Sequence, residues 1–222
     1  MAPLVLLDLD GTLMDSAPGI TASVAHAFTA LGLPVPDAAT LRSFVGPPIT
    51  DSLPAHGVPP ERLAEAVGAY RAEFRATGMW DNAVFAGIPE QLARLRAAGC
   101  ELAVATSKPE VFAVPIAERF GLSALVDGVF GAPLDEQATK ADVIAKALAA
   151  LGRTPADGPA PGLGRVLMVG DREHDVVGAR AHDIGCLGVS WGYAHPGELE
   201  AAGALAVVDD VAALENAVLS LV

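Results

Sequence analysis

The chain has 222 residues, of which 52% are hydrophobic and 18% are charged, and its formal net charge is −13. The high apolar content excludes a largely disordered protein and indicates a globular one. Because an acidic surface repels a polyanion, we expect no nucleic-acid partner. No apolar run reaches membrane-spanning length, and no basic segment followed by a cleavable apolar stretch opens the chain. We therefore expect a cytoplasmic protein without a membrane partner.

The first predicted element is a strand at residues 4–7, a continuous apolar run that ends in Asp8 and Asp10. An apolar run without alternation is typical of a strand buried on both faces. Such strands occur in parallel sheets, so this segment already favours an α/β protein.

The next segment, residues 15–84, predicts helices in place of strands. Apolar residues at helical spacing form two stripes, Val24, Phe28 and Leu31 in one, and Leu63, Val67, Tyr70 and Phe74 in the other. Proline-containing turns separate the two stripes. We expect a helical domain inserted directly after the first strand, with no strand inside it.

From residue 85 onward, strand and helix patterns alternate. Further apolar runs predict strands at residues 101–106, 127–131, 165–170, 186–190 and 204–208. The alternation predicts an α/β fold built on a doubly wound parallel sheet. The predicted core comprises residues 1–14 and 85–222, and the predicted helical insertion comprises residues 15–84.

Two features lie outside this alternation. The segment at residues 153–164 is rich in proline and glycine and is expected to be a surface loop. Cys100 and Cys186 each follow a glycine just before an apolar run. We expect both to be buried free thiols at the start of strands.

Polar side chains follow the predicted strands at the points where the strands end. In an open parallel sheet, ligands bind at this edge. The candidates are Asp8, Asp10, Thr12, Thr106, Ser107, Lys108, Lys140, Asp171 and Asp175.

Asp8 and Asp10 are the most informative of these residues. Two carboxylates close together at the end of a buried strand repel each other and lose solvation. A divalent cation between them removes that cost, and Mg²⁺ prefers a few carboxylates together with water and phosphate oxygens. With its charge screened, Asp8 can attack a phosphorus atom and form an acyl phosphate, while Asp10 protonates the leaving oxygen and later deprotonates water. The alternative is a strand-ending aspartate followed by a turn or helix-capping aspartate.

The segment Asp8–Leu13 resembles the first signature of the haloacid dehalogenase-like (HAD) superfamily, specifically its phosphatase branch. Its other signatures follow in the expected order: Thr106, then Lys140, then Gly170-Asp171-x-x-x-Asp175. The resemblance covers essentially the whole chain, and it implies a Rossmann-like core with a mobile helical cap.

Within this superfamily the chain is most similar to the phosphoglycolate phosphatase-like group. The similarity is carried by Asp15-Ser16, by the Phe-Val-Gly-Pro-Pro segment at residues 44–48 and by the Thr-Ser-Lys-Pro segment at residues 106–109. It implies a Mg²⁺-dependent phosphatase that acts on a small phosphorylated metabolite. Phosphoglycolate and a nucleoside 5′-monophosphate are the leading substrates by this resemblance alone.

The resemblance also assigns roles to the candidate residues. Asp8, Asp10, Thr106 and Lys140 are the expected catalytic residues; Asp8, Asp10, Asp171 and Asp175 are the expected metal ligands; and Thr12, Ser107 and Lys108 are expected to bind substrate. Chemically, the Thr106 hydroxyl and nearby backbone N–H groups suit a phosphate oxygen. Lys140 would balance the carboxylates and the charge on the transferring phosphoryl group.

Several of these residues have a structural alternative. Ser107-x-x-Glu110 fits a helix capping box, which would leave only the Ser107 backbone for phosphate. Lys108 is otherwise an exposed lysine, and Asp171 a helix cap. Asp175 either ligates the metal or orients Lys140 or a metal-bound water.

Substrate choice is expected to lie in the cap. The candidates there are Arg42, Gly46, Pro47, Pro48 and Arg75, and an arginine at position 42 suits a carboxylate or a second phosphate. An ordinary surface arginine is the alternative for Arg42. Outside the cap, Arg172 and His174 are expected to face solvent.

Two other functions stay open from the sequence. A phosphosugar mutase would pass the phosphoryl group from Asp8 to a sugar hydroxyl, and a non-catalytic regulator would only bind a metabolite. The predicted partner in each case is a small phosphorylated molecule. The protein is expected to be a monomer or a homodimer.

Overall fold

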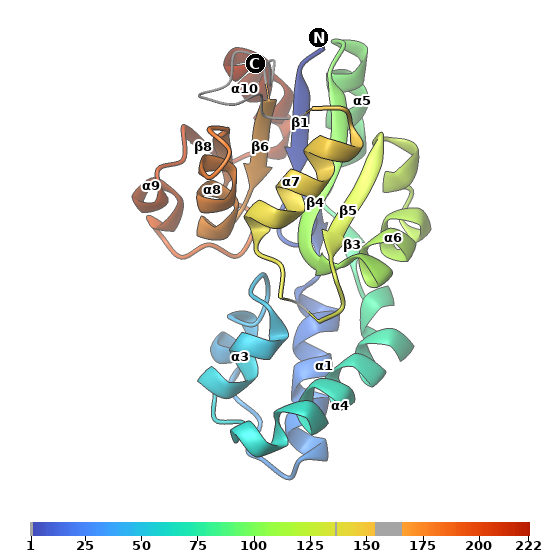
Figure 1. The fold of residues 1–222 in the computed structure, drawn as a ribbon, viewed down its shortest axis with the longest axis vertical. Coiled ribbons are helices and arrows are strands. Elements are labelled where there is room, and N and C mark those ends of the chain that lie inside the picture. The colour runs from blue at the N-terminus through green and yellow to red at the C-terminus, as the bar shows by residue number, and fades with distance from the viewer. Residues whose placement is uncertain (1, 136, 154–165) are drawn as a thin grey trace.

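The computed structural model describes residues 2–135, 137–153 and 166–222. Its core is a six-stranded sheet in the order β5-β4-β1-β6-β7-β8 (Figure 1). The strands are β1 (Leu4–Leu7), β4 (Glu101–Pro109), β5 (Gly128–Ala132), β6 (Val166–Gly170), β7 (Gly185–Val189) and β8 (Ala206–Val208). All neighbouring strands are parallel, which confirms the predicted α/β fold.

β1 lies in the middle of the sheet and is buried on both faces. Val5 and Leu7 belong to one apolar cluster, and Leu4 and Leu6 to a second. Successive side chains of a strand point to opposite faces, so the two clusters mark the two sides of the sheet. The unbroken apolar run of the sequence follows from this double burial.

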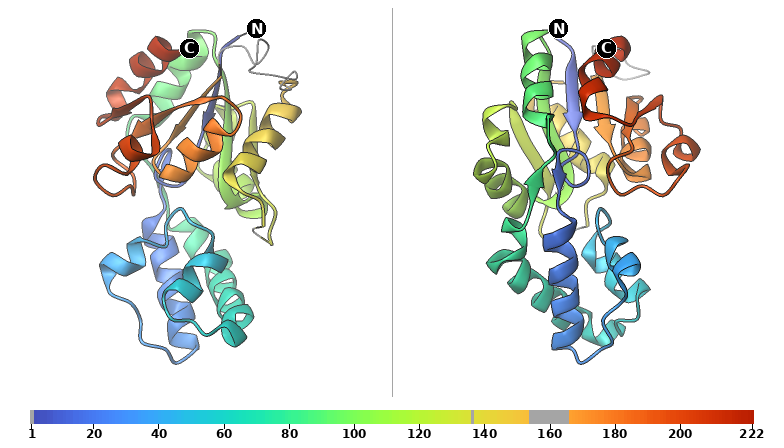
Figure 2. Two further views of the ribbon diagram at one scale, coloured as in Figure 1. Left: turned by 60° about the vertical axis from the view of Figure 1, so that its left-hand side comes forward. Right: turned by 180° about the vertical axis from the view of Figure 1, so that it is seen from behind.

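Helices cover both faces of the sheet (Figures 1 and 2). The cluster of Val5 and Leu7 receives apolar residues from α5 (Ile88–Ala97), α6 (Glu110–Arg119) and α10 (Leu214–Leu221). The cluster of Leu4 and Leu6 receives them from α7 (Lys140–Ala150), α8 (Glu173–Arg180) and α9 (Glu198–Ala202).

A separate group of helices lies beyond the carboxyl ends of the strands (Figure 2). This helical cap contains α1 (Ala17–Ala30), α2 (Ala38–Arg42), α3 (Ile49–Ala55) and α4 (Leu63–Ala76). Short 3₁₀ turns lie at Pro60–Arg62 and Gly78–Trp80 in the cap, and at Leu122–Ala124 and Val211–Ala213 in the core. α1 packs along α4, and the two predicted apolar stripes form the contact.

The cap is joined to the core by a small antiparallel ribbon of β2 (Met14–Asp15) and β3 (Ala83–Val84). The prediction that residues 15–84 contain no strand is therefore wrong at both ends of that range. Two-residue strands are too short for a period-two pattern, so the sequence carries no signal for them.

Three smaller predictions can be compared with the structure. Cys100 and Cys186 are buried and free, as expected. The predicted loop at residues 153–164 lies outside the described residues apart from Arg153, and so does the first residue of the strand predicted at 165–170. None of the described helices has the length and apolar character needed to cross a membrane.

Candidate active site

The carboxyl ends of the central strands meet at the edge of the sheet that faces the cap (Figure 1). Asp8 follows β1 and Asp171 follows β6. Thr106 lies in the C-terminal half of β4, and Lys140 is the first residue of α7. A narrow pocket at this edge is lined by Asp8, Asp10, Gly46, Thr106, Ser107, Lys108, Lys140, Arg172, His174 and Asp175. Residues from five distant parts of the sequence therefore share one site.

Lys140 lies between two carboxylates. Its Nζ is 2.6 Å from Asp8 Oδ1 and 2.6 Å from Asp175 Oδ1, and the three side chains are almost fully buried. The start of α7 is fixed by reciprocal capping hydrogen bonds between Thr139 and Asp142, which hold Lys140 in place. Burial disfavours the ammonium form, but Asp175 and Asp8 outweigh burial and raise the pKa of Lys140. Lys140 is therefore a fixed positive charge in the site.

Asp8 nevertheless holds a proton more readily than an ordinary aspartate. Burial raises the pKa of Asp8 to about 6, with Asp175 and Asp10 acting in the same direction and Lys140 acting against them. An ion pair by itself lowers the pKa of a carboxyl group. The pKa of Asp8 is raised chiefly because the carboxyl group is buried, and the ion pair with Lys140 offsets only part of that effect.

Asp171 is buried and tightly held. The Thr12 hydroxyl donates to its Oδ1 at 3.3 Å, and the Tyr193 backbone N–H donates to its Oδ2 at 2.8 Å. Gly11 and Gly192 approach this carboxylate so closely that a Cβ on either residue would overlap it. Burial, with Asp175 and Asp8 adding to it, raises the pKa of Asp171 well above its usual value. The Thr12 hydroxyl therefore orients a carboxylate; it was predicted to bind substrate, and it does not line the pocket.

Three of the predicted metal ligands form a group that suits a cation. Asp8, Asp171 and Asp175 each offer a carboxylate oxygen, and these oxygens lie within 4.8 Å of one another. Carboxylate oxygens are the ligands that Mg²⁺ prefers in proteins, and a divalent cation would offset the charge of these three clustered carboxylates. The donor set therefore fits Mg²⁺. The Asp10 carboxylate lies outside this group.

Asp10 instead pairs with Lys108. The Lys108 Nζ is 2.8 Å from Asp10 Oδ2, and both side chains are close to fully buried. The same ammonium lies 4.8 Å from the ring centroid of Phe74 in the cap. The alternative of an exposed Lys108 is therefore wrong, and Lys108 connects the acid/base candidate to the cap.

The predicted capping box at Ser107 and Glu110 is wrong. β4 continues to Pro109, and α6 begins at Glu110 with no side-chain bond to its first turn. Residues that precede a proline favour extended backbone, which carries the strand past Ser107. The Glu110 carboxylate accepts hydrogen bonds from the Gly131 N–H at 3.0 Å and from Lys146 at 2.6 Å. Ser107 therefore does not cap α6, and it lines the pocket.

The Thr106 hydroxyl accepts one hydrogen bond and can still donate another. The Lys108 backbone N–H donates to Thr106 Oγ1 at 3.2 Å. A hydroxyl group that accepts one hydrogen bond can still donate another. The Thr106 side chain can thus donate to a ligand oxygen in the pocket.

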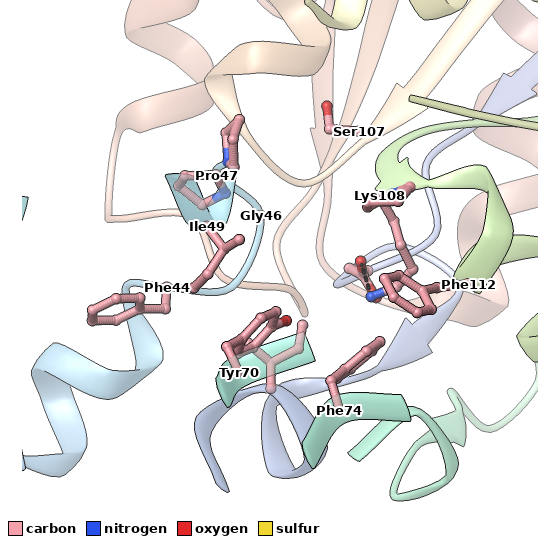
Figure 3. Close-up of a pocket in the computed structure, with 13 residues that line it drawn as sticks. Phe44, Gly46, Pro47, Ile49, Tyr70, Phe74, Ser107, Lys108 and Phe112 are labelled. Carbon is pink, nitrogen blue, oxygen red and sulfur yellow. Dashed lines mark ion pairs between the residues drawn. The ribbon is translucent and has the colours of Figure 1, made fainter. Parts of the chain in front are cut away.

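The cap contributes Gly46 and Pro47 to the same region, while Arg42 lies apart from it. Gly46 lines the pocket beside Asp8, and both Gly46 and Pro47 line a neighbouring cavity (Figure 3). The Arg42 guanidinium stacks over the Tyr193 ring, 4.8 Å from its centroid, and lines neither of these cavities.

The prediction that Arg172 faces solvent is wrong. Its side chain is only 12% exposed and pairs with Glu198 at 2.8 Å. It also donates to the Val45 carbonyl of the cap at 2.9 Å. A salt bridge and a carbonyl acceptor across the cap interface explain its burial. His174 is exposed, as expected, at the rim of the pocket.

Tyr193 is a site residue that our sequence reasoning missed. Its hydroxyl donates to Asp15 Oδ1 at 2.7 Å and accepts from the backbone N–H groups of Ser16 and Ala17 at 2.9 and 3.0 Å. Burial and the Asp15 carboxylate raise the pKa of Tyr193, so its hydroxyl keeps its proton. Because Tyr193 follows β7 at the functional edge of the sheet, the rule that selected the other candidates also points to this loop.

Comparison with known proteins agrees with this site. A sequence model of the haloacid dehalogenase-like hydrolase family matches residues 5–189. A solved structure, a predicted phosphatase from Clostridium acetobutylicum, superposes with a TM-score of 0.90 at 38% sequence identity and covers 100% of both chains.

Two relatives of similar sequence are named for different activities. The tyrosine-protein kinase PtkA of Mycobacterium tuberculosis is 46% identical over 191 residues, which are 86% of this chain and 62% of PtkA. The chain thus spans less than two thirds of that relative's length. A 5′-nucleotidase of Pseudomonas aeruginosa is 40% identical over 215 residues, which are 96% of this chain and 94% of the nucleotidase.

Proposed function

The chain belongs to the haloacid dehalogenase-like hydrolase family, and we propose that it is a Mg²⁺-dependent phosphatase. It would hydrolyse the phosphomonoester of a small metabolite through an aspartyl-phosphate intermediate on Asp8. The observation that carries this proposal is the buried set of Asp8, Lys140, Asp171 and Asp175, in which one lysine pairs with two of three clustered carboxylates. Such a set suits an anionic group bound together with a cation.

In the first proposed step, Asp8 displaces the leaving group. A bond forms between an Asp8 carboxylate oxygen and phosphorus as the bond from phosphorus to the leaving oxygen breaks, and the proton on Asp10 moves to that oxygen. In the second step, water replaces Asp8 on phosphorus and gives a proton to Asp10, which releases phosphate. Asp10 thus returns to its starting state.

The remaining residues support these two steps. Lys140 offsets the charge that develops on the phosphoryl group, and the Thr106 hydroxyl donates to one of its oxygens. Lys108 holds Asp10 beside the pocket through the 2.8 Å contact between its Nζ and Asp10 Oδ2. Asp8, Asp171 and Asp175 would hold Mg²⁺, which neutralises charge shared by the phosphate and the carboxylates.

The proposal is tested by phosphate release from p-nitrophenyl phosphate. We expect release with Mg²⁺ and none after chelation of the metal. Asp8→Asn and Asp10→Asn should each abolish turnover, while Asp10→Asn should still bind phosphate analogues. A near-normal rate in Asp8→Asn would exclude the aspartyl-phosphate route.

The leading substrates remain phosphoglycolate and a nucleoside 5′-monophosphate. The first rests on the sequence motifs, and the second is also supported by the 40% identity to a 5′-nucleotidase. Release of free phosphate separates this function from a phosphosugar mutase, which would yield an isomerised sugar phosphate. It also separates it from a non-catalytic regulator.

The relative at 46% identity favours a second candidate, transfer of a phosphoryl group to a tyrosine hydroxyl. The test is incubation of the purified chain with γ-labelled ATP and Mg²⁺, followed by phosphoamino-acid analysis. Stable label on tyrosine would support the kinase. Label that appears only as free phosphate supports the phosphatase.

A further inference from the structure

A second cavity opens from the catalytic pocket toward the cap (Figure 3). Asp10, Ser107 and Lys108 line both spaces, so the cavity begins at the residue proposed to protonate the leaving group. A group attached to the leaving oxygen would therefore extend into this cavity.

The cavity is built mainly from aromatic and aliphatic side chains. Phe44, Tyr70 and Phe74 reach it from the cap and Phe112 from α6, as Figure 3 shows. The Tyr70 and Phe74 rings stack with centroids 5.6 Å apart, and Phe112 meets Phe74 edge to face at 5.4 Å. Stacked and edge-to-face contacts are the arrangements that aromatic rings prefer, so a ring on the leaving group would meet partners of matching chemistry in this wall.

Positive charge is scarce in the same cavity. Among the described residues that line it, Lys108 is the only cation, and its ammonium already pairs with Asp10. The Arg42 guanidinium lies over Tyr193, and Arg75 contacts the Phe112 ring without lining the cavity. A carboxylate on the leaving group would lose its hydration here without gaining a cation of its own.

We propose that the physiological leaving group carries an aromatic ring, which binds in this aromatic cavity. Esters with a short carboxylate leaving group, such as phosphoglycolate, would then be poor substrates. This inference rests on the proposed phosphatase function and chooses between its candidate substrates. Pockets lined mainly by apolar side chains, with a few placed polar groups, select ligands of matching shape and polarity.

The test compares esters that share a leaving alkoxide and differ in the ring. With Mg²⁺ present, we expect kcat/KM for adenosine 5′-monophosphate to exceed that for ribose 5-phosphate at least tenfold, and to exceed that for phosphoglycolate. A second pair, 2-phenylethyl phosphate and ethyl phosphate, shows whether any ring suffices or a nucleobase is required. A preference for the ring-bearing ester in either pair, with phosphoglycolate the poorer substrate, supports the proposal.

Three results would overturn it. Equal rates within both pairs, or a preference for phosphoglycolate, would reject the aromatic leaving group while leaving the phosphatase intact. Absence of phosphate release from every ester would reject the phosphatase function, and this inference with it.

Two variants, one within α6 and one at the residue that follows it, test whether the preference for a ring arises in this cavity. Phe112→Leu should lower the ratio of kcat/KM between adenosine 5′-monophosphate and ribose 5-phosphate at least fivefold. Phe120→Leu, at the end of the same helix and outside the cavity lining, should leave the ratio within twofold of the wild-type value. Equal changes in both variants would contradict the assignment. If Phe112→Leu does not fold, the substrate pairs on the wild-type protein still decide the question.

Discussion

Lys140 is the residue on which the electrostatics of the site depend. It is the only cation within ion-pair distance of Asp8 and Asp175 among the described side chains, and it sits 2.6 Å from each. Removing one partner of a buried ion pair leaves the other charges without compensation. A single substitution here therefore affects both the fold and the proposed chemistry.

We predict that Lys140→Met lowers the free energy of unfolding by about 3 kcal/mol. It should also lower kcat at least about 100-fold, because it removes a charge that faces the phosphoryl group. Lys146 provides the control on the same helix, since its pair with Glu110 is exposed. Lys146→Met should cost less than about 1 kcal/mol and leave kcat unchanged. Denaturant unfolding and steady-state kinetics check both variants, and equal effects would contradict the prediction.

Tyr193 contributes through two different parts of the residue. Its backbone N–H holds the Asp171 carboxylate, whereas its hydroxyl holds the backbone at Ser16 and Ala17, where the chain enters the cap. A substitution that removes only the hydroxyl therefore separates the two contributions.

We predict that Tyr193→Phe lowers the free energy of unfolding by about 1–3 kcal/mol, because it removes the acceptor of the Ser16 N–H and leaves the Ala17 N–H only its 3.3 Å bond to Asp15 Oδ1. Its affinity for Mg²⁺, measured by calorimetry, should stay within about threefold of wild type, since the bond to Asp171 is made by the backbone. Asp171→Asn is the comparison and should lose measurable Mg²⁺ binding. A large loss of Mg²⁺ affinity in Tyr193→Phe would contradict this division of roles.

At the scale of elements, the loop that precedes α3 connects the cap to the core through a hydrogen bond. Arg172 at the start of α8 donates to the Val45 carbonyl, and the neighbouring Gly46 has a φ of +107°. A Cβ at Gly46 would lie 3.1 Å from the Arg172 side chain. Only glycine allows this backbone and this close approach together.

We predict that Gly46→Ala raises KM and lowers the free energy of unfolding by about 1 kcal/mol or more. Gly32 is the matched control within the cap, because its φ of +65° is also positive but no atom lies within 4 Å of its Cβ position. Gly32→Ala should lower stability to a similar extent and leave KM unchanged. A similar rise in KM in both variants would show that backbone strain alone is responsible.

The elements also show which parts of the fold the sequence encodes locally. Continuous apolar runs such as residues 4–7 predict central strands well, because burial on both faces removes polar residues. The sequence does not predict β2 and β3, because each two-residue strand is defined by its partner across 67 intervening residues and not by its own pattern. The end of β4 was misplaced because a local capping motif competed with an extended chain before Pro109.

The same distinction applies to the site. Asp8, Lys140 and Asp171 stand at strand or helix ends with recognisable motifs, so their meeting at one edge follows from the topology. The Lys108–Asp10 pair, the burial of Arg172 and the hydroxyl contacts of Tyr193 depend on how the cap docks against the core. No single segment of the sequence contains that docking.

For the whole molecule, acidity and metal binding are linked. The chain carries a formal net charge of −13, and the carboxylates of Asp8, Asp171 and Asp175 lie close together in its interior. Burial raises the pKa of Asp8 from 3.8 to about 6 and that of Asp171 well above 3.8. The metal-free fold therefore favours the protonated forms, and it loses stability as the pH rises from about 4 through about 6.

A cation bound to these carboxylates reverses the preference, because it interacts with their ionised forms. We predict that saturating Mg²⁺ raises the unfolding temperature, and that it does so more at pH 7.5 than at pH 5. Asp171→Asn should abolish most of this increment at pH 7.5, whereas Asp127→Asn, at an exposed ion pair with Arg96, should retain it. Thermal unfolding at matched ionic strength, with and without chelator, checks the prediction. An increment that is equal at the two pH values would show that Mg²⁺ does not act through the buried carboxylates.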